Sequence, residues 1–278
     1  MHLKQNAKAI EEFEYRLQCH DEYFQNYPLE QGLKTAPPEN HYMVYNQAQW
    51  QHFQAGVNWL YLQNLDAAQA HLAEVMPLLK QSMAACYSIE LPLYFSYFQT
   101  ALLLGLPEDA NEAANIVAKL EPASNRASEL MQVLMAKLWL GYSDIPEAWL
   151  KTITRSEQNK GHSLIYVGFS AALKAFAGSN KPALASAITT ILEHHRHVLR
   201  YLRWTANITQ LYETTSTLLV IIAKQRGWNI KPMIGTTQYQ IKIRPEDYLH
   251  REGMTSKTRV EVCTDFLPDV FVDNPVYR

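Results

Sequence analysis

Glycine is scarce in this sequence, at 10 of 278 residues. Because glycine costs roughly 1 kcal/mol relative to alanine inside a helix, a chain with little glycine and much Ala, Leu, Gln and Glu is suited to helices. A basic excess is also missing, since the formal net charge is −2. A general nucleic-acid-binding protein usually carries a large positive charge. We therefore expect a mainly helical protein with no nucleic-acid partner.

Long apolar segments and a cysteine framework are absent as well. The longest apolar run, 218–223, is far shorter than the roughly 20 residues that a membrane-spanning helix needs. Residues 1–8 contain no continuous apolar stretch of the kind found in a secretory signal. The three cysteines, Cys19, Cys86 and Cys263, lie far apart, which suits a reducing compartment. We expect a cytoplasmic protein without a membrane span.

Motifs that support catalysis are not found in the chain. It contains no glycine-rich phosphate loop, no Gly-x-Ser-x-Gly elbow, no His-Glu-x-x-His pair and no Cys-x-x-Cys pair. Paired acids such as Glu11-Glu12 and Glu108-Asp109 suit helix starts and exposed surface. The prediction is a protein that is not an enzyme and that holds no cofactor and no metal.

Most of the chain has the pattern of helices. Apolar residues recur at helical spacing within 7–27, and the adjacent prolines Pro37 and Pro38 then assign 28–40 to a loop. Between residues 41 and 230, two helical stretches joined by a short turn recur several times. These turns lie near 63–64, 107–109, 143–146 and 178–180, at spacings of roughly 36–44 residues, which is in the range of helix-pair repeats.

Glycine and proline mark the ends of these predicted helices. A glycine that takes the left-handed conformation ends a helix, and proline suits the first turn of the helix that follows. Three turns have both: Gly105 with Pro107, Gly141 with Pro146, and Gly178 with Pro182. No copy matches a full tetratricopeptide consensus. The pattern predicts helical hairpins packed as a repeat-like closed bundle or as a short solenoid.

The end of the chain changes in character. A last helix is predicted at 207–226, with a wide apolar face and Gly227 as its stop. Beyond it, 239–243 and 259–263 alternate polar and apolar residues with the period of a strand, which predicts a small β hairpin or an extended tail. We expect one α-helical domain over 1–278, composed of the helix and loop of 1–40, the hairpins of 41–230 and the partly extended tail of 231–278.

One cluster of ionisable residues stands out, Glu193-His194-His195-Arg196-His197. His194 and His197 are three residues apart on one helix face, and Glu193 is a possible third ligand, so a metal site fits the spacing. The apolar residues of the same helix place His195 at the edge of the core and turn His194 and His197 outward. Because no second ligand pair lies at a recognisable spacing, a solvent-exposed helix face explains the cluster better.

A basic stripe overlaps this cluster, formed by Arg196, Arg200 and Arg203 at positions i, i+4 and i+7. Arginine suits bidentate binding of carboxylate or phosphate, so the stripe is a candidate docking surface for an acidic protein. An exposed face whose charges are offset by neighbouring acids explains it too. If a partner binds here, we expect His194 and His197 to contact it together with the three arginines.

Two segments of the chain carry a resemblance to a known family. The first is Val167–Gly178, VGFSAALKAFAG, followed by an Ala-rich helix that ends LEHHR. The second is Leu218–Ile230, LLVIIAKQRGWNI, in which a helix ending in Arg-Gly precedes a strand-like segment. Together they resemble the immunity protein 49 family of bacterial toxin systems, over about 160–260. The resemblance implies an α-helical protein that neutralises a cognate polymorphic toxin by direct binding.

Three functional hypotheses follow. The leading one is an immunity protein, a rigid helical scaffold whose complementary surface masks a toxin that acts on a cytosolic target. The second is a helical-repeat, tetratricopeptide-like adaptor that binds a peptide in a groove lined by the first helices of the hairpins. The third is a metal-dependent enzyme centred on Glu193, His194 and His197.

Overall fold

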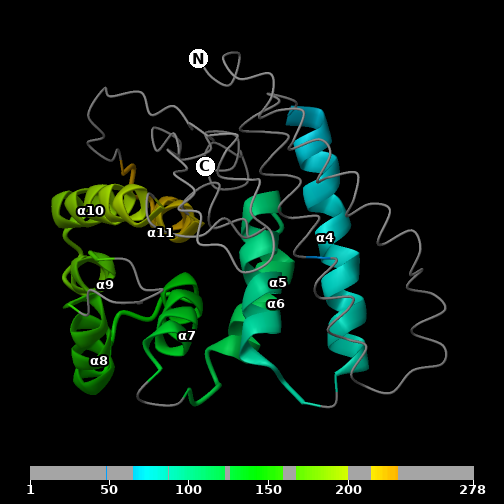
Figure 1. The fold of residues 1–278 in the computed structure, drawn as a ribbon, viewed down its shortest axis with the longest axis horizontal. Helices are drawn as coiled ribbons and strands as arrows, with labels where there is room; N and C mark the ends of the chain where they lie inside the picture. The colour runs from blue at the N-terminus through cyan, green and yellow to red at the C-terminus, as the bar shows by residue number, and fades with distance from the viewer. Residues whose placement is uncertain are drawn as a thin grey trace, which may run out of the picture. The chain divides into compact units, whose positions relative to one another are not determined.

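The computed structural model describes residues 48, 65–86, 88–122, 126–158, 167–199 and 214–230. These residues form eight α-helices, α4–α11 (Figure 1), and contain no strand. The fold of the described chain is therefore mainly α-helical, as the sequence predicts. The predicted helix of 7–27, the loop of 28–40 and the two predicted strands lie outside the described residues.

The helices have the following bounds: α4 Leu65–Ala85, α5 Leu91–Leu104, α6 Pro107–Val117, α7 Ala127–Trp139, α8 Glu147–Gln158, α9 Phe169–Ala177, α10 Lys181–Leu199 and α11 Thr214–Gln225. Short turns join α5 to α6, α7 to α8 and α9 to α10, where the sequence pattern predicts helix pairs. Among these helices, none combines the length and the apolar composition that crossing a membrane requires.

Contacts divide the chain into two compact units. One contains Met1–Ile89, Arg196–Tyr212 and Gln238–Thr264, and it includes α4. The other contains Glu90–His195, Glu213–Thr237 and Asp265–Arg278, and it includes α5–α9, most of α10, and α11. We call this second one the hairpin unit. The single domain expected over 1–278 stays a prediction.

Three helices of the hairpin unit end at a glycine in the left-handed conformation, with φ of 71° at Gly105, 89° at Gly141 and 70° at Gly227. Each end has the two hydrogen bonds of a Schellman motif. After α5, for example, the Gly105 N–H donates to the Leu102 carbonyl at 3.2 Å and the Leu106 N–H to the Ala101 carbonyl at 2.9 Å. The left-handed conformations predicted for Gly105 and Gly141 are confirmed.

The left-handed conformation predicted for Gly178 is wrong. Its φ is −85°, and Ser179 has the positive φ instead, at 51°. The reason lies in the next residue, Asn180, which serves two helices. Its N–H donates to the Ala175 carbonyl at 2.8 Å and closes α9, while its Oδ1 accepts a hydrogen bond from the Ala183 N–H at 3.0 Å and caps α10. The left-handed position therefore falls on the residue before Asn180.

The prolines lie close to their predicted positions. Pro107 is the first residue of α6 and Pro182 the second of α10. The turn predicted at 107–109 is therefore already helical. Pro146 lies just before α8, where its carbonyl accepts hydrogen bonds from the N–H groups of Trp149 at 3.0 Å and Leu150 at 3.1 Å. It is the N-cap residue of α8, one position before the predicted first turn.

Polar side chains join α5, α6 and α7. The Tyr97 hydroxyl of α5 donates to the Asp109 carboxylate of α6, and the Trp139 indole N–H of α7 donates to the Asn111 Oδ1 of α6 at 2.8 Å. The ring of Trp139 also meets Phe98 of α5 edge to face, with centroids 6.4 Å apart. Because buried tyrosine and tryptophan need a partner for their polar atom, these bonds let large rings fill the core.

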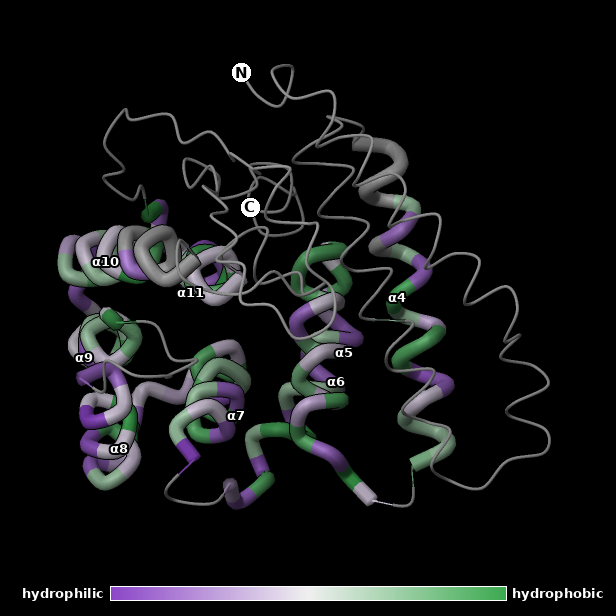
Figure 2. The backbone as a smooth tube through the Cα atoms, in the orientation of Figure 1, coloured by the Kyte–Doolittle hydropathy of each residue, from purple (hydrophilic) through white to green (hydrophobic). Residues whose placement is uncertain are grey.

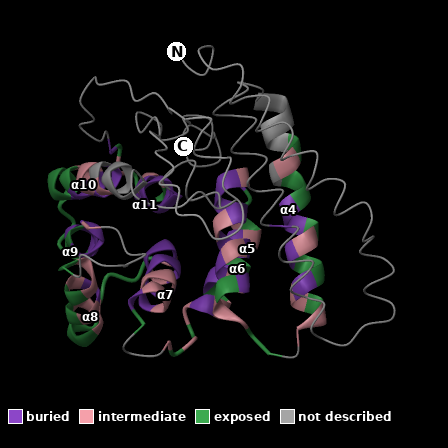
Figure 3. Ribbon diagram, in the orientation of Figure 1, coloured by how far each residue is buried: buried purple, intermediate pink, exposed green. Residues whose placement is uncertain are grey.

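The most deeply buried helix of the hairpin unit is α11. Residues 214–223 are all buried, including Thr214 and Thr217 (Figure 3). α11 packs against α5 and α7, the first helices of two hairpins. The apolar face predicted for 207–226 is therefore too narrow, since residues on every side of the helix are buried from 214 to 223. Residues 207–213 lie outside the described residues.

α8 is the opposite case. Of its residues, all of which the structure describes, Ile153 alone is buried. Its outer side is hydrophilic (Figure 2) and exposed (Figure 3). Near the end of α8, Glu157 accepts hydrogen bonds from the Ser170 N–H at 2.7 Å and from the Ser170 hydroxyl at 2.6 Å. α9 thus obtains a carboxylate at its N-terminus from α8, because Gly168 has no side chain to cap it.

Candidate partner-binding surfaces

The histidines and the first arginine that the sequence singles out belong to α10. The structure describes the side chain of His194, which is half-buried. Its Nδ1 accepts a long hydrogen bond, at 3.4 Å, from the Val167 N–H. The outward orientation predicted for His194 is therefore only partly right. Its side chain is half-buried and accepts a hydrogen bond from Val167, the residue before Gly168.

The rest of this cluster lies outside the described residues, namely the side chains of Glu193, His195, Arg196 and His197, and the whole of Arg200 and Arg203. In the described part of the chain, no group of three or more His, Cys, Asp or Glu residues is arranged to hold a metal ion. The Nδ1 of His194 already accepts a hydrogen bond from a backbone N–H. The metal site and the arginine docking surface stay hypotheses.

A second candidate surface lies at the C-terminal ends of α7, α9 and α11, which Arg226 joins. Its Nη2 donates to the Leu138 carbonyl at 2.6 Å and to the Tyr142 carbonyl at 3.1 Å, both at the end of α7. The guanidinium carbon lies 5.1 Å from the ring centroid of Phe176 in α9. Because the C-terminus of a helix carries partial negative charge, a cation is favourable at this place.

The contact between Arg226 and Phe176 continues as a stack. The ring of Phe176 lies on the indole of Trp228, with centroids 5.4 Å apart and planes 15° from parallel. The Lys181 ammonium lies 6.0 Å from the Trp228 ring centroid. Arg226 therefore contacts Phe176, Phe176 contacts Trp228, and Trp228 contacts Lys181. These contacts connect the ends of α7, α9 and α11 to the start of α10. Contacts of this kind stabilise by about 0.5–1.5 kcal/mol each.

Arg226 is held in place by its surroundings. Burial lowers the pKa of its guanidinium below the ordinary value, but arginine keeps its proton at neutral pH. Its Nε is buried and has no hydrogen-bond partner within the described part of the chain. The carbonyls of Leu138 and Tyr142 and the face of Phe176 fix the side chain, and Arg226 joins the ends of the three helices.

Three turns surround this stack, and we call them the turn face: 141–144 after α7, 178–181 after α9 and 227–229 after α11. All of these residues are exposed except Trp228, which is half-buried. Tyr142 is 57% exposed. Positive φ angles and the bonds of the Schellman motif fix each turn. The turn face is therefore an exposed surface with a well-defined backbone.

No family model, curated protein or solved structure matches the chain.

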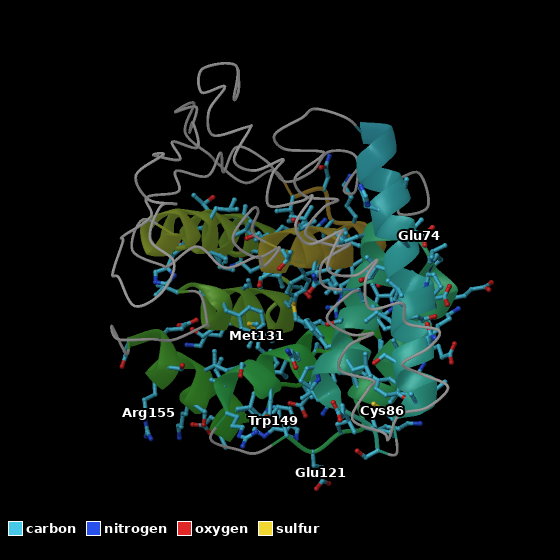
Figure 4. The ribbon with its side chains drawn as sticks, turned by 45° about the vertical axis from the view of Figure 1, so that its right-hand side comes forward. Glu74, Cys86, Glu121, Met131, Trp149 and Arg155 are labelled. Carbon is cyan, nitrogen blue, oxygen red and sulfur yellow. The ribbon has the colours of Figure 1, made fainter. Side chains whose placement is uncertain are left out.

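The outer side of α8 is a further exposed surface. Lys151 pairs with Glu147 at 2.7 Å, and the Lys137 ammonium of α7 lies 4.9 Å from the Trp149 ring centroid. The side chain of Arg155 points away from the helices (Figure 4). Charges of both signs that pair locally are typical of a solvated helix face, so this side carries no candidate site.

The sequence predicts several of the turns and helix ends that form the turn face, but it does not predict that they lie together. The sequence pattern predicts turns at Gly141 and Gly178 and the end of a helix at Gly227. Arg226 and Trp228 belong to the segment that resembles the immunity family. Nothing in the spacing shows that these positions are neighbours, because their adjacency depends on how α7, α9 and α11 pack. Tyr142 was missed, since one exposed tyrosine in a turn carries no periodic signal.

Proposed function

We propose that this protein is an immunity protein that binds a cognate bacterial toxin and neutralises it by direct contact. One observation carries the proposal. The two segments that resemble the immunity protein 49 family pack on each other, with Phe176 of the first stacked on Trp228 of the second and covered by Arg226. Segments so far apart in sequence are expected to meet if the shared pattern describes a structural core. Their packing therefore supports the resemblance.

The proposed activity needs no reaction chemistry. Masking a toxin requires a rigid scaffold and a complementary surface of at least ~1,000 Å² in total. The closed helix ends and the buried α11 are features of a rigid scaffold. We expect the complex to form in the cytoplasm, with a protein as the only partner.

The adaptor hypothesis has one observation in its favour, the succession of helix pairs from α5 to α10. A peptide-binding solenoid would leave the first helices of its hairpins open to the peptide. Here α11 packs against two of those helices, α5 and α7, and is itself buried over 214–223. A peptide would have to displace a buried segment of the same chain, so this packing favours the immunity protein.

Co-expression with the product of the gene immediately upstream tests the proposal. We expect that product to be toxic alone, harmless together with this protein, and co-purified with it in a fixed ratio. If the neighbour is not toxic and unrelated proteins co-purify, the adaptor hypothesis replaces the proposal. Stoichiometric metal in the purified protein would instead favour an enzyme centred on Glu193, His194 and His197.

A further inference from the structure

We propose that the turn face is the surface that docks the partner, and that the partner is a folded protein with an acidic binding surface. The inference rests on the proposed function. The turns read Gly-Tyr-Ser, Gly-Ser-Asn and Gly-Trp-Asn at 141–143, 178–180 and 227–229. This is the composition of surfaces that recognise proteins. Tyr and Trp supply large contact area at low entropy cost, and Ser, Gly and Asn supply adaptable hydrogen bonds.

The two aromatic residues of the turn face are held rigidly. The Tyr142 N–H donates to the Lys137 carbonyl at 3.0 Å, and its own carbonyl accepts from Arg226 at 3.1 Å. The backbone of Tyr142 is thus fixed on both sides while 57% of the residue is exposed. Trp228 is fixed by the bond of its N–H to the Ala223 carbonyl at 2.9 Å and by Phe176. Aromatic residues on a fixed backbone make strong anchors because less ordering remains to be done on binding.

Charge identifies the kind of partner. Lysines lie in the last turns of α9 and α11, at Lys174 and Lys224, and the turn face adds Lys181. Asp144 is the one carboxylate within 141–144, 178–181 and 227–229. This excess of cations fits a surface that carries carboxylates around a pocket for Tyr142, because opposite potentials favour encounter and orientation. A polyanion such as nucleic acid fits less well, since the net charge of the chain is −2.

Two variants of the full-length protein test the inference. Tyr142→Ala removes the exposed anchor, and Lys181→Glu reverses one charge. Both should fold normally, because the Tyr142 side chain lies largely in solvent and a negative charge is favourable in the first turn of α10. Two exposed residues outside the turn face provide matched controls, Arg155→Ala for truncation and Lys119→Glu for charge reversal. Unchanged circular dichroism verifies the fold of each variant, and for Lys181→Glu we expect at most a small fall in Tm from the lost contact with Trp228.

The probe is the purified product of the upstream gene, with its affinity measured by calorimetry and its association rate by surface plasmon resonance at two salt concentrations. We expect Tyr142→Ala to weaken binding at least about tenfold, the range of an interface anchor. Lys181→Glu should slow association several-fold at low salt and reduce its salt dependence. Both controls should stay within about twofold of the unmodified protein.

The other outcomes separate the inference from the proposed function. If all four variants bind and neutralise the toxin as the unmodified protein does, the turn face is overturned and the proposed function stands. Loss of binding confined to replacement of Arg196, Arg200 and Arg203 by Ala would overturn it too and place the partner on that stripe. If the upstream product is neither toxic nor bound, the proposed function and the turn face as docking surface are both rejected. A labelled single-stranded oligonucleotide that binds the unmodified protein and not Lys181→Glu would overturn the acidic protein as occupant.

Discussion

At the scale of single residues, Gly168 is a position where both the backbone and its surroundings restrict substitution. Its φ is 107°, and a Cβ built there would lie 3.0 Å from the Ala187 carbonyl oxygen and 3.2 Å from side-chain atoms of Thr190 and Ile191. Gly168→Ala therefore combines backbone strain with a clash against α10. We expect the free energy of unfolding to fall by about 2–4 kcal/mol, measured by urea denaturation.

Gly141→Ala is the matched control for that substitution. Its φ is 89°, and a Cβ there would meet no atom within 4 Å. Only the strain remains, so we expect a loss of about 1–2 kcal/mol. Equal losses at the two positions would contradict the argument that α10 limits the space at Gly168.

Arg226 is the second residue whose role is local and testable. Arg226→Met removes two hydrogen bonds from a charged donor to the carbonyls of Leu138 and Tyr142. We expect a loss of about 2–3 kcal/mol. Arg226→Lys keeps the charge but not the planar group that lies on Phe176, so it should lose an intermediate amount. Chemical denaturation of both variants measures the order.

A matched arginine is available in Arg126, which pairs with Glu129 at 2.7 Å on the surface. The hydrogen bond to Glu129 and the attraction of its charge raise the pKa of Arg126. Because this pair is solvated, Arg126→Met should leave the unfolding midpoint unchanged. If Arg126→Met lowers the unfolding midpoint as much as Arg226→Met does, the loss of stability comes from removing any arginine side chain. It would then not come from the contacts by which Arg226 joins the helix ends.

At the scale of elements, the start of α9 depends on a carboxylate from α8. Glu157→Gln removes the negative charge that accepts both hydrogen bonds of Ser170. We expect a loss of about 1–2 kcal/mol, the size of an N-cap contribution. Ser170→Ala removes the hydroxyl and keeps the N–H, so it should cost less. In a double-mutant cycle the two losses should couple by at least about 0.5 kcal/mol. Strict additivity would contradict a direct interaction.

The ends of the helices are the elements that the sequence predicts best. Gly105 and Gly141 lie after apolar helical stretches, and glycine is the residue that adopts a positive φ without strain. Local sequence therefore decides these ends. At Gly178 the local sequence is not sufficient. Asn180 closes one helix and caps the next, so the left-handed position moves to Ser179, and only the combined geometry of two helices reveals this.

Burial of α11 and formation of the turn face could not be predicted. Thr214 and Thr217 are polar residues that suggest an exposed helix face, yet both are buried. The periodicity of a sequence identifies the apolar side of a helix only when the other side is exposed. A helix that is covered on all sides lacks this contrast, so the pattern does not predict its burial. Likewise, Phe176 and Trp228 meet because α9 and α11 end at the same place, which depends on packing between distant segments.

At the scale of the whole molecule, the two compact units raise the question of how cooperatively the chain unfolds. Each unit is assembled from three separate segments of the chain. α10 runs without interruption from Lys181 to Leu199, across the division between His195 and Arg196. Independent domains are usually joined by linkers that few contacts cross. Here a continuous helix crosses the division instead of a linker, so we expect the two units to unfold together.

We therefore expect a single calorimetric transition in which the van't Hoff and calorimetric enthalpies agree. Arg226→Met, a substitution in the hairpin unit, should lower the midpoint of that whole transition. If the units unfold independently, the same variant would shift one of two transitions and leave the other in place. A chain of this length often unfolds through intermediates. A single transition would therefore indicate that the continuity of α10 and the division of each unit among three segments make unfolding cooperative.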